Sequence, residues 1–347
     1  MPGVPFEELT LRASEAATAG RLLEALRFAR AGVALNPMWS QGWFYVGMIG
    51  HLQGRFVEAR DAFRKVVEIA PEWAAAWALL GLCEFQLEEY DRALDDIRRG
   101  QSLGLSGDEE IERAAFLHEA LLLIRMGEFE RSVAPLTELV RTQPDSAGLR
   151  AACGLMVLRI AALPTEVAPD QRDLVMTAGA AGCSVLAGRP EEAEEGFEKL
   201  VARYPSARGV HGAYGLFLSG EASERALPML RKEVELYPDN ARAHLQIALE
   251  ELTRGQAAAA LPSAREAARL APELFATNLA LGRALAETGA VEEGIAELEQ
   301  AAVLGPERAE VYLALARAYA AAGRFRDVER AREKLLELEA RRRPQLR

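Results

Sequence analysis

Residues 40–71, SQGWFYVGMIGHLQGRFVEARDAFRKVVEIAP, decide how this chain folds. Apolar residues recur on both sides of Gly54, and Pro71 follows the second apolar stretch. Glycine readily adopts the positive φ that ends a helix, and proline cannot continue one. The stretch therefore predicts two α-helices, joined near Gly54 and closed by Pro71, that pack as a hairpin.

The same pattern recurs along the 347 residues of the chain. Prolines that follow an apolar helix end stand at one constant interval from Pro37 to Pro71, from Pro238 to Pro272 and from Pro272 to Pro306. Such a fixed period is typical of a repeat architecture. We expect nine full hairpins, near residues 6–37, 40–71, 74–105, 113–144, 174–205, 207–238, 241–272, 275–306 and 309–340.

Single positions within residues 40–71 resemble the tetratricopeptide repeat family, whose period of about 34 residues matches the proline interval. The positions that carry the resemblance are Trp43, Val46, Gly47, Gly54, Phe56, Ala59, Phe63 and Pro71, followed in the next unit by Trp77, Leu80, Gly81, Tyr90, Ala93 and Ile97. The resemblance implies an all-α fold, a right-handed superhelical α-solenoid of tandem helix-turn-helix hairpins. Each hairpin is then stabilised by stacking on its neighbours.

The regular spacing breaks between Pro144 and Pro205. Residues 147–161 keep the pattern of a first helix, but a segment with Pro164 and Pro169 stands where its partner helix is expected. We expect an N-terminal block at 1–161 with four hairpins and an unpaired helix, an irregular proline-bounded loop at 162–171, and a C-terminal block at 172–347 with five hairpins. The loop is either the remnant of a degenerate repeat or a hinge or docking segment.

The resemblance also implies that the first helices of successive hairpins line a concave groove. In the N-terminal block this register gives an apolar row, here named the first-helix strip: Phe44, Met48, His51, Leu82, Phe85, Leu117, Leu121, Ile124, Leu155 and Leu158. In the C-terminal block it gives a mixed face: Arg242, Leu245, Leu249, Leu279, Arg283, Glu287, Leu313 and Arg317. About half of the strip is expected to pack against neighbouring helices. The remainder is predicted to bind an apolar segment of a partner protein.

Charge and hydropathy argue against two classes of partner. The formal net charge is −11 and the pI is about 5.2, so the chain repels phosphate backbones and no nucleic-acid partner is expected. No apolar stretch has the length of a membrane span, and the N-terminal residues do not resemble a secretory signal. We expect a cytoplasmic protein; a periplasmic or membrane-associated location is the alternative if a targeting segment was removed.

Residues that carry chemistry are scattered. The cysteines are Cys83, Cys153 and Cys183, and the histidines are His51, His118, His211 and His244. The cysteines form no CxxC pair and are interpreted as small buried residues in a reducing compartment. The histidines lack the i, i+4 spacing of metal ligands, and no GxxxxGK[ST], GxSxG or HExxH motif occurs. We therefore expect no metal, no cofactor, no catalytic residue and no enzyme activity.

The function expected from these observations is a scaffold or adaptor that binds a peptide or helix of a partner protein, in a bacterial-type assembly and as a monomer or weak homo-oligomer. Two other classes stay open: a regulatory or substrate-recruiting domain of a larger enzyme, and a structural component that self-associates through its terminal repeats. The last residues, KLLELEARRRPQLR, are charged enough to act as a solubilising cap, with Arg341, Arg342, Arg343 and Arg347 as a solvated basic tail.

Overall fold

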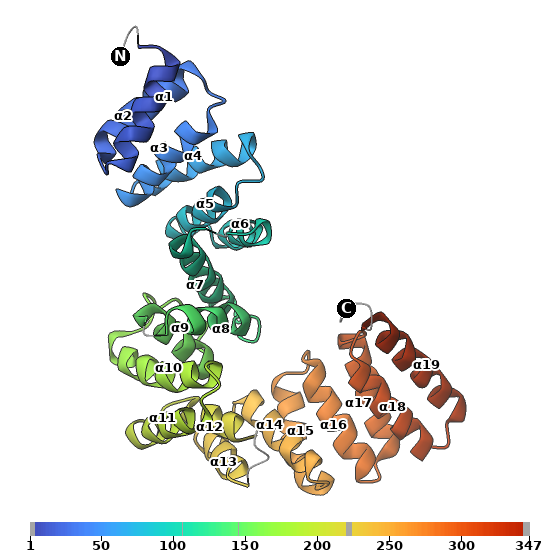
Figure 1. Ribbon diagram of the computed structural model, residues 1–347. Helices are drawn as coiled ribbons and strands as arrows, with labels where there is room; N and C mark the ends of the chain where they lie inside the picture. Colours follow the sequence, from blue (N-terminus) through green and yellow to red (C-terminus); the bar gives the residue numbers. More distant parts are fainter. Residues whose placement is uncertain (1–3, 106, 145, 220–223, 343–347) are drawn as a thin grey trace. The chain divides into compact units, whose positions relative to one another are not determined.

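The computed structural model describes residues 4–105, 107–144, 146–219 and 224–342, and within them the chain is helical without any strand (Figure 1). The α-helices are α1 (Phe6–Thr18), α2 (Leu22–Leu35), α3 (Ser40–Leu52), α4 (Phe56–Ile69), α5 (Ala74–Gln86), α6 (Tyr90–Leu103), α7 (Glu109–Arg125), α8 (Val133–Thr142), α9 (Ala147–Leu158), α10 (Arg172–Leu186), α11 (Pro190–Arg203), α12 (Val210–Ser219), α13 (Ala226–Leu236), α14 (Ala241–Thr253), α15 (Ala257–Leu270), α16 (Phe275–Glu287), α17 (Val291–Leu304), α18 (Ala309–Ala321) and α19 (Phe325–Arg342). A short 3-10 helix, η1 (Pro169–Gln171), precedes α10. The prediction of an all-α fold of tandem hairpins is confirmed.

The turn inside a hairpin requires one residue with positive φ. Gly54 takes φ +70° between α3 and α4. At the same place in the next hairpin, one repeat later, the chain carries Glu88 instead, which adopts φ +62°. A residue with a Cβ is strained in this conformation, so the repeat geometry overrides the local preference of Glu88.

A side-chain hydrogen bond ties each of six first helices to the proline before it. The donor stands six residues after the proline and the acceptor is the proline carbonyl oxygen. The pairs are Trp43 with Pro37 (2.8 Å), Trp77 with Pro71 (2.8 Å), His211 with Pro205 (2.8 Å), His244 with Pro238 (3.0 Å), Asn278 with Pro272 (2.8 Å) and Tyr312 with Pro306 (3.1 Å). The bond satisfies a carbonyl that no helix can use. His211 and His244 therefore stabilise the link between repeats.

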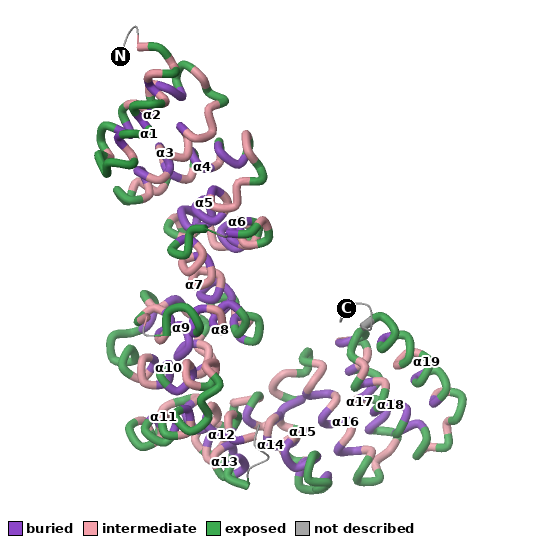
Figure 2. The backbone as a smooth tube through the Cα atoms, in the orientation of Figure 1, coloured by how far each residue is buried: buried purple, intermediate pink, exposed green. Residues whose placement is uncertain are grey.

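The core runs between helices, and buried positions lie on the facing sides of paired helices (Figure 2). Phe63 of α4, Ile97 of α6 and Leu122 of α7 belong to one buried cluster that spans three consecutive hairpins. Small residues allow the close approach: a Cβ at Gly81 would lie 2.7 Å from the carbonyl oxygen of Ala93. Each hairpin thus depends on its neighbours for burial of its apolar face.

The chain forms two compact units, unit 1 (Met1–Gly196) and unit 2 (Phe197–Arg347), which are described separately below. The sequence placed the division at the 162–171 loop, whereas in the structure the division falls inside α11. The reason lies in the loop itself. Leu163 and Val167 are buried, and Glu166 accepts a hydrogen bond from the Leu163 amide and pairs with Arg125 of α7.

The prediction that the helix at 147–161 is unpaired was wrong, because α9 packs against α10. A Cβ at Gly154 would lie 1.9 Å from the carbonyl oxygen of Val175, and one at Gly179 would lie 1.8 Å from that of Arg150. Only glycines permit this backbone approach. The long connection of residues 159–171 lets α10 reach α9, so α10 takes the place of the missing second helix.

The basic tail lies partly outside the described residues, which end at 342, so Arg343 and Arg347 are not among them. At the end of α19, Arg341 forms an ion pair with Glu337 one helical turn earlier.

Candidate partner-binding surface

Half of the first-helix strip is buried. Its buried members are Leu82, Leu121, Ile124, Leu155 and Leu158, each at most 7% exposed. They fill the space between helices of unit 1 and present no surface to a partner.

The other members, Phe44, Met48, His51, Phe85 and Leu117, are partly exposed. Several of them join neighbouring hairpins. Phe44 stacks on Trp73 with ring centroids 4.5 Å apart, and the edge of Phe85 meets His118 at 4.6 Å. A role of these five residues in partner binding stays a prediction.

His51 also contacts a thiol, since its Nδ1 lies 3.5 Å from Sγ of Cys83. Burial lowers the pKa of His51 and raises the pKa of Cys83 to about 12. A buried thiol that stays protonated is a poor nucleophile. The contact therefore packs hairpin 2 (α3 and α4) against hairpin 3 (α5 and α6) and forms no reactive pair.

The mixed face predicted for the C-terminal block lies on first helices of unit 2. Arg242 of α14 and Arg317 of α18 are exposed, and Arg283 of α16 is partly exposed and lies 3.7 Å from Glu287. These side chains are spread over three hairpins, and the three arginines stay predicted binding residues.

A groove of about 870 Å³ lies in unit 1, lined by α2, α3, α4 and the turn between α5 and α6; we name it the α2–α4 groove. Its floor is apolar and comprises Val33, Trp43, Val46 and Ala62. Val33, Val46 and Ala62 are buried, each at most 6% exposed. The Trp43 side chain is held by its hydrogen bond to the Pro37 carbonyl oxygen. The groove therefore has a preformed floor.

One end of the groove is more open and still apolar. Phe56, Val57 and Leu87 line it, and the Val57 side chain is 54% exposed. This surface was not predicted from the sequence, because the contact face was taken from first helices only. The lining residues of α2 and α4 belong to second helices.

Charged side chains form the rim of the groove. Glu58 of α4 pairs with Arg30 of α2 and, at 2.8 Å, with Arg55. Asp61 and Lys65 complete the rim, which thus holds three basic and two acidic groups. Nε of Arg55 is buried, and no described residue accepts a hydrogen bond from it.

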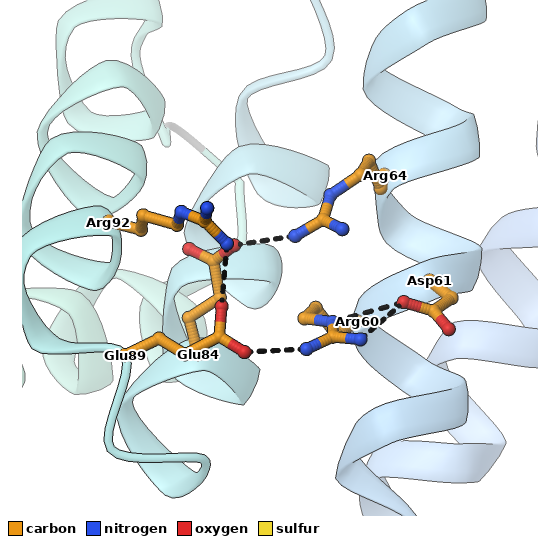
Figure 3. A network of polar contacts seen from close by, with 6 residues as sticks. All are labelled: Arg60, Asp61, Arg64, Glu84, Glu89 and Arg92. Carbon is orange, nitrogen blue, oxygen red and sulfur yellow. Dashed lines mark hydrogen bonds and ion pairs between the residues drawn. The ribbon is translucent and has the colours of Figure 1, made fainter.

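A polar network anchors α4, which forms one wall of the groove, to hairpin 3 (Figure 3). Arg60 pairs with Asp61 at 2.8 Å and with Glu89 at 2.6 Å, and Arg92 also reaches Glu89, at 3.2 Å. The hydrogen bond to Asp61 is the main cause of the raised pKa of Arg60. The network holds the groove wall in a defined position relative to α5 and α6.

A carboxyl pair lies behind this network. Glu84 of α5 is 1% exposed and accepts a hydrogen bond from Arg64 at 3.1 Å. Asp96 of α6 is its neighbour, and burial, followed by the hydrogen bond to Glu84, raises the pKa of Asp96 to about 7. Protonated Asp96 donates a hydrogen bond to the Glu84 carboxylate and keeps its proton, because two adjacent charges would repel each other.

In several repeats a charged residue stands seven positions before the closing proline, or before Leu105, which replaces that proline in one repeat. The predictions from the sequence did not use this pattern. In the structure such residues make contacts between hairpins: Arg64 with Glu84 (3.1 Å), Arg98 with Glu119 (2.8 Å), Arg231 with Glu251 (2.8 Å) and Glu299 with the Tyr319 hydroxyl (2.8 Å). These charges stabilise the stacking of hairpins.

Two further properties concern the part of the chain that the structure describes. No group of three or more His, Cys, Asp or Glu side chains there could hold a metal ion. None of the helices there combines the length and the apolar character needed to cross a bilayer.

The sequence and the fold were compared with known proteins. Among solved structures, the chain is similar to a fragment of MamA from Desulfovibrio magneticus RS-1 that runs from residue 41 of MamA to its end. The identity is 22% over 50% of this chain and 96% of that chain, and the TM-score is 0.43. It is also similar to YrrB, described as a TPR protein with an unusual peptide-binding site, with 17% identity over 46% of this chain and 83% of that chain and a TM-score of 0.42. No curated protein matched the sequence.

A family model described as "Tetratricopeptide repeat" matches residues 10–73 and 245–309. The first segment lies within α1 to α4 and the turn that follows, and the second runs from α14 to the first residue of α18. Hairpins of the same construction continue between the two segments. Residues 10–73 and 245–309 of this chain are thus tetratricopeptide repeats.

Proposed function

We propose that this protein is an interaction scaffold and that unit 1 binds an amphipathic helix of a partner protein in the α2–α4 groove. The observation that carries the proposal is a preformed apolar floor framed by charged side chains. Floors of this kind bind the apolar face of a helix, and charges at the rim select the residues that flank that face.

The dimensions and the charge of the groove favour one kind of occupant. A volume of about 870 Å³ accommodates several apolar side chains. Arg30, Arg55 and Lys65 outnumber Glu58 and Asp61 on the rim, so acidic flanks fit better than basic ones. We therefore commit to an amphipathic helix with an apolar face and acidic flanks.

Two designed peptides test this proposal by fluorescence anisotropy. Both carry the same leucine face, one with glutamate flanks and the other with lysine flanks. We expect the glutamate peptide to bind, and we expect Val57→Glu and Lys65→Glu each to weaken its binding about tenfold, or about 1.4 kcal/mol. Both side chains are exposed, so the substitutions leave the core intact.

Leu52→Glu is the matched control. Leu52 is 62% exposed at the end of α3 but does not line the groove, so the variant should bind like the wild type. Failure of the wild type to bind the glutamate peptide, or equal binding of the two peptides, contradicts the proposal.

The first-helix strip is the other candidate surface of unit 1. Phe44→Glu combined with Phe85→Glu should abolish partner binding if the strip is the site. Because Phe44 stacks on Trp73 and meets Phe63, thermal unfolding of the variant must be compared with that of the wild type. A folded double variant that loses binding, while Val57→Glu retains it, assigns the site to the strip.

End-to-end self-association is less well supported. The face of α3 that packs toward the first hairpin buries Gly42, Val46 and Ile49. At the same positions one repeat earlier, α1 carries Glu8, Arg12 and Glu15. A charged face opposes burial against a second copy. Sedimentation at increasing protein concentration distinguishes a monomer from an assembly.

The other alternative is a recruiting domain of a larger enzyme. A gene that continues past Arg347 into a catalytic domain would favour it.

A further inference from the structure

Two of the three cysteines meet where α9 crosses α10 in unit 1. Cys153 lies beside Gly154, whose contact with Val175 brings the two helix backbones together. A Cβ at Gly182, the residue before Cys183, would lie only 3.4 Å from Cβ of Cys153. Cys183 lies four residues after Gly179, on the face of α10 that meets α9, and its side chain interacts with that of Cys153. The tight crossing thus brings the two cysteines close together although they lie on different helices and far apart in the sequence.

The two thiols differ in reactivity. Cys153 is fully buried, whereas Cys183 is partly exposed. The hydrogen bond from Cys153, and then the guanidinium groups of Arg150 and Arg189, lower the pKa of Cys183. The hydrogen bond to Cys183 and burial raise the pKa of Cys153. Cys183 is therefore the thiol that ionises and meets solvent, and Cys153 is its protonated neighbour.

We propose that Cys153 and Cys183 are a redox-sensitive thiol pair that a peroxide converts into a disulfide across the α9–α10 crossing. The Cys183 thiolate attacks the peroxide O–O bond, which breaks; Cys183 becomes a sulfenic acid, and with one proton hydrogen peroxide yields one water. The Cys153 sulfur then attacks the Cys183 sulfur. The S–S bond forms, the hydroxyl leaves with the thiol proton as a second water, and the peroxide has been reduced by two electrons.

The bond would have a structural effect on unit 1. It closes the chain segment between Cys153 and Cys183, which contains the irregular residues 159–171. A cross-link of this kind restricts the unfolded chain and stabilises the folded state. Oxidation would therefore fix α10 against α9, the contact that replaces the missing second helix of this repeat.

Cys83 is an internal control within the same unit. It is fully buried, and burial raises its pKa to about 12. In the folded protein it should therefore resist both oxidation and alkylation. A thiol-specific reagent should react with Cys183 at least about tenfold faster than with Cys83.

The experiment treats the folded full-length protein with dilute hydrogen peroxide, blocks free thiols after denaturation, and maps tryptic peptides by mass spectrometry. Cys153 lies in the peptide 151–159, Cys183 in 173–199 and Cys83 in 66–92. We expect the first two peptides to be joined, with the loss of two hydrogen atoms, and the third to carry the blocking group. The thermal midpoint should rise on oxidation and return after reduction.

Cys153→Ser isolates the first step. This variant should trap a sulfenic acid on Cys183 that reacts with dimedone, whereas Cys83→Ser should form the disulfide like the wild type. Circular dichroism confirms that each variant is folded. Three results would overturn the proposal. They are sulfinic acid on Cys183 of the wild type without a disulfide, a disulfide that forms only between two chains, and oxidation of Cys83 as fast as that of Cys183.

Discussion

The guanidinium of Arg64 on α4 donates a hydrogen bond to the carboxylate of Glu84 on α5 across 3.1 Å, and Glu84 is only 1% exposed. Unit 2 repeats this relationship at the same sequence spacing, with Arg231 and Glu251 2.8 Å apart and the Glu251 side chain 4% exposed. In both pairs a second helix holds a buried carboxylate of the next first helix. A buried charge without a partner is costly, so each pair couples neighbouring hairpins.

Removal of Arg64 should destabilise the protein, because the Glu84 carboxylate then stays buried without its cationic partner. We expect Arg64→Met to lower the free energy of unfolding by roughly 2 kcal/mol, because the carboxylate loses a charge-assisted hydrogen bond. Urea unfolding followed by circular dichroism measures the loss. The double variant Arg64→Met with Glu84→Gln should recover part of it, and additive effects of the two changes would show that the residues are not coupled.

Asp96 should make unit 1 less stable as the pH rises. Its folded-state pKa is about 7 against an ordinary value of 3.8. The folded state therefore retains a proton that the unfolded chain releases near pH 4. The stabilising contribution of this proton is complete below pH 4 and is lost as the pH rises through 7.

Asp96→Asn should accordingly raise the thermal midpoint at pH 8 and flatten its decrease between pH 5 and pH 8. Thermal unfolding at several pH values, compared with the wild type, checks this. Asp91→Asn, an exposed position on the same helix, is the control. A pH profile that Asp96→Asn leaves unchanged would show that another group titrates.

Gly154→Ala should destabilise the α9–α10 crossing. The added methyl would lie 1.9 Å from a backbone oxygen of Val175, so the helices must separate, at a cost of about 1–3 kcal/mol. Gly148→Ala on the same helix meets the flexible end of Leu117 at 3.1 Å, and Ser146 Oγ lies at an ordinary contact distance of 3.7 Å. The control should therefore cost clearly less, and hydrogen exchange of α9 and α10 amides should report the difference.

Glu88→Gly should stabilise the protein. Glu88 holds φ +62°, a conformation that costs a residue with a side chain about 1 kcal/mol more than glycine. We expect a gain of roughly that size in urea unfolding. Glu88→Ala keeps the strain while removing the carboxylate, so it should bring no gain; an equal gain from both variants would assign the effect to charge.

The hairpins were predictable because their signals are local. Gly54 and Pro71 mark helix ends within a few residues, and the constant repeat spacing reproduces those marks along the chain. The spacing that allows the hydrogen bond between repeats is also visible in the sequence, since Trp77 stands six residues after Pro71 as Trp43 does after Pro37. The candidate site was less predictable, because half of the first-helix strip is buried against other helices.

The sequence alone determined the class of fold, the repeat and the ends of most helices, because backbone preferences and helical periodicity act over short distances. Tertiary structure decided which apolar residues remain exposed, that second helices build the α2–α4 groove, and that α10 pairs with α9 through Gly154. It also brought Cys153 close to Cys183. These features depend on how helices distant in sequence pack, and packing follows from shape and close approach in three dimensions.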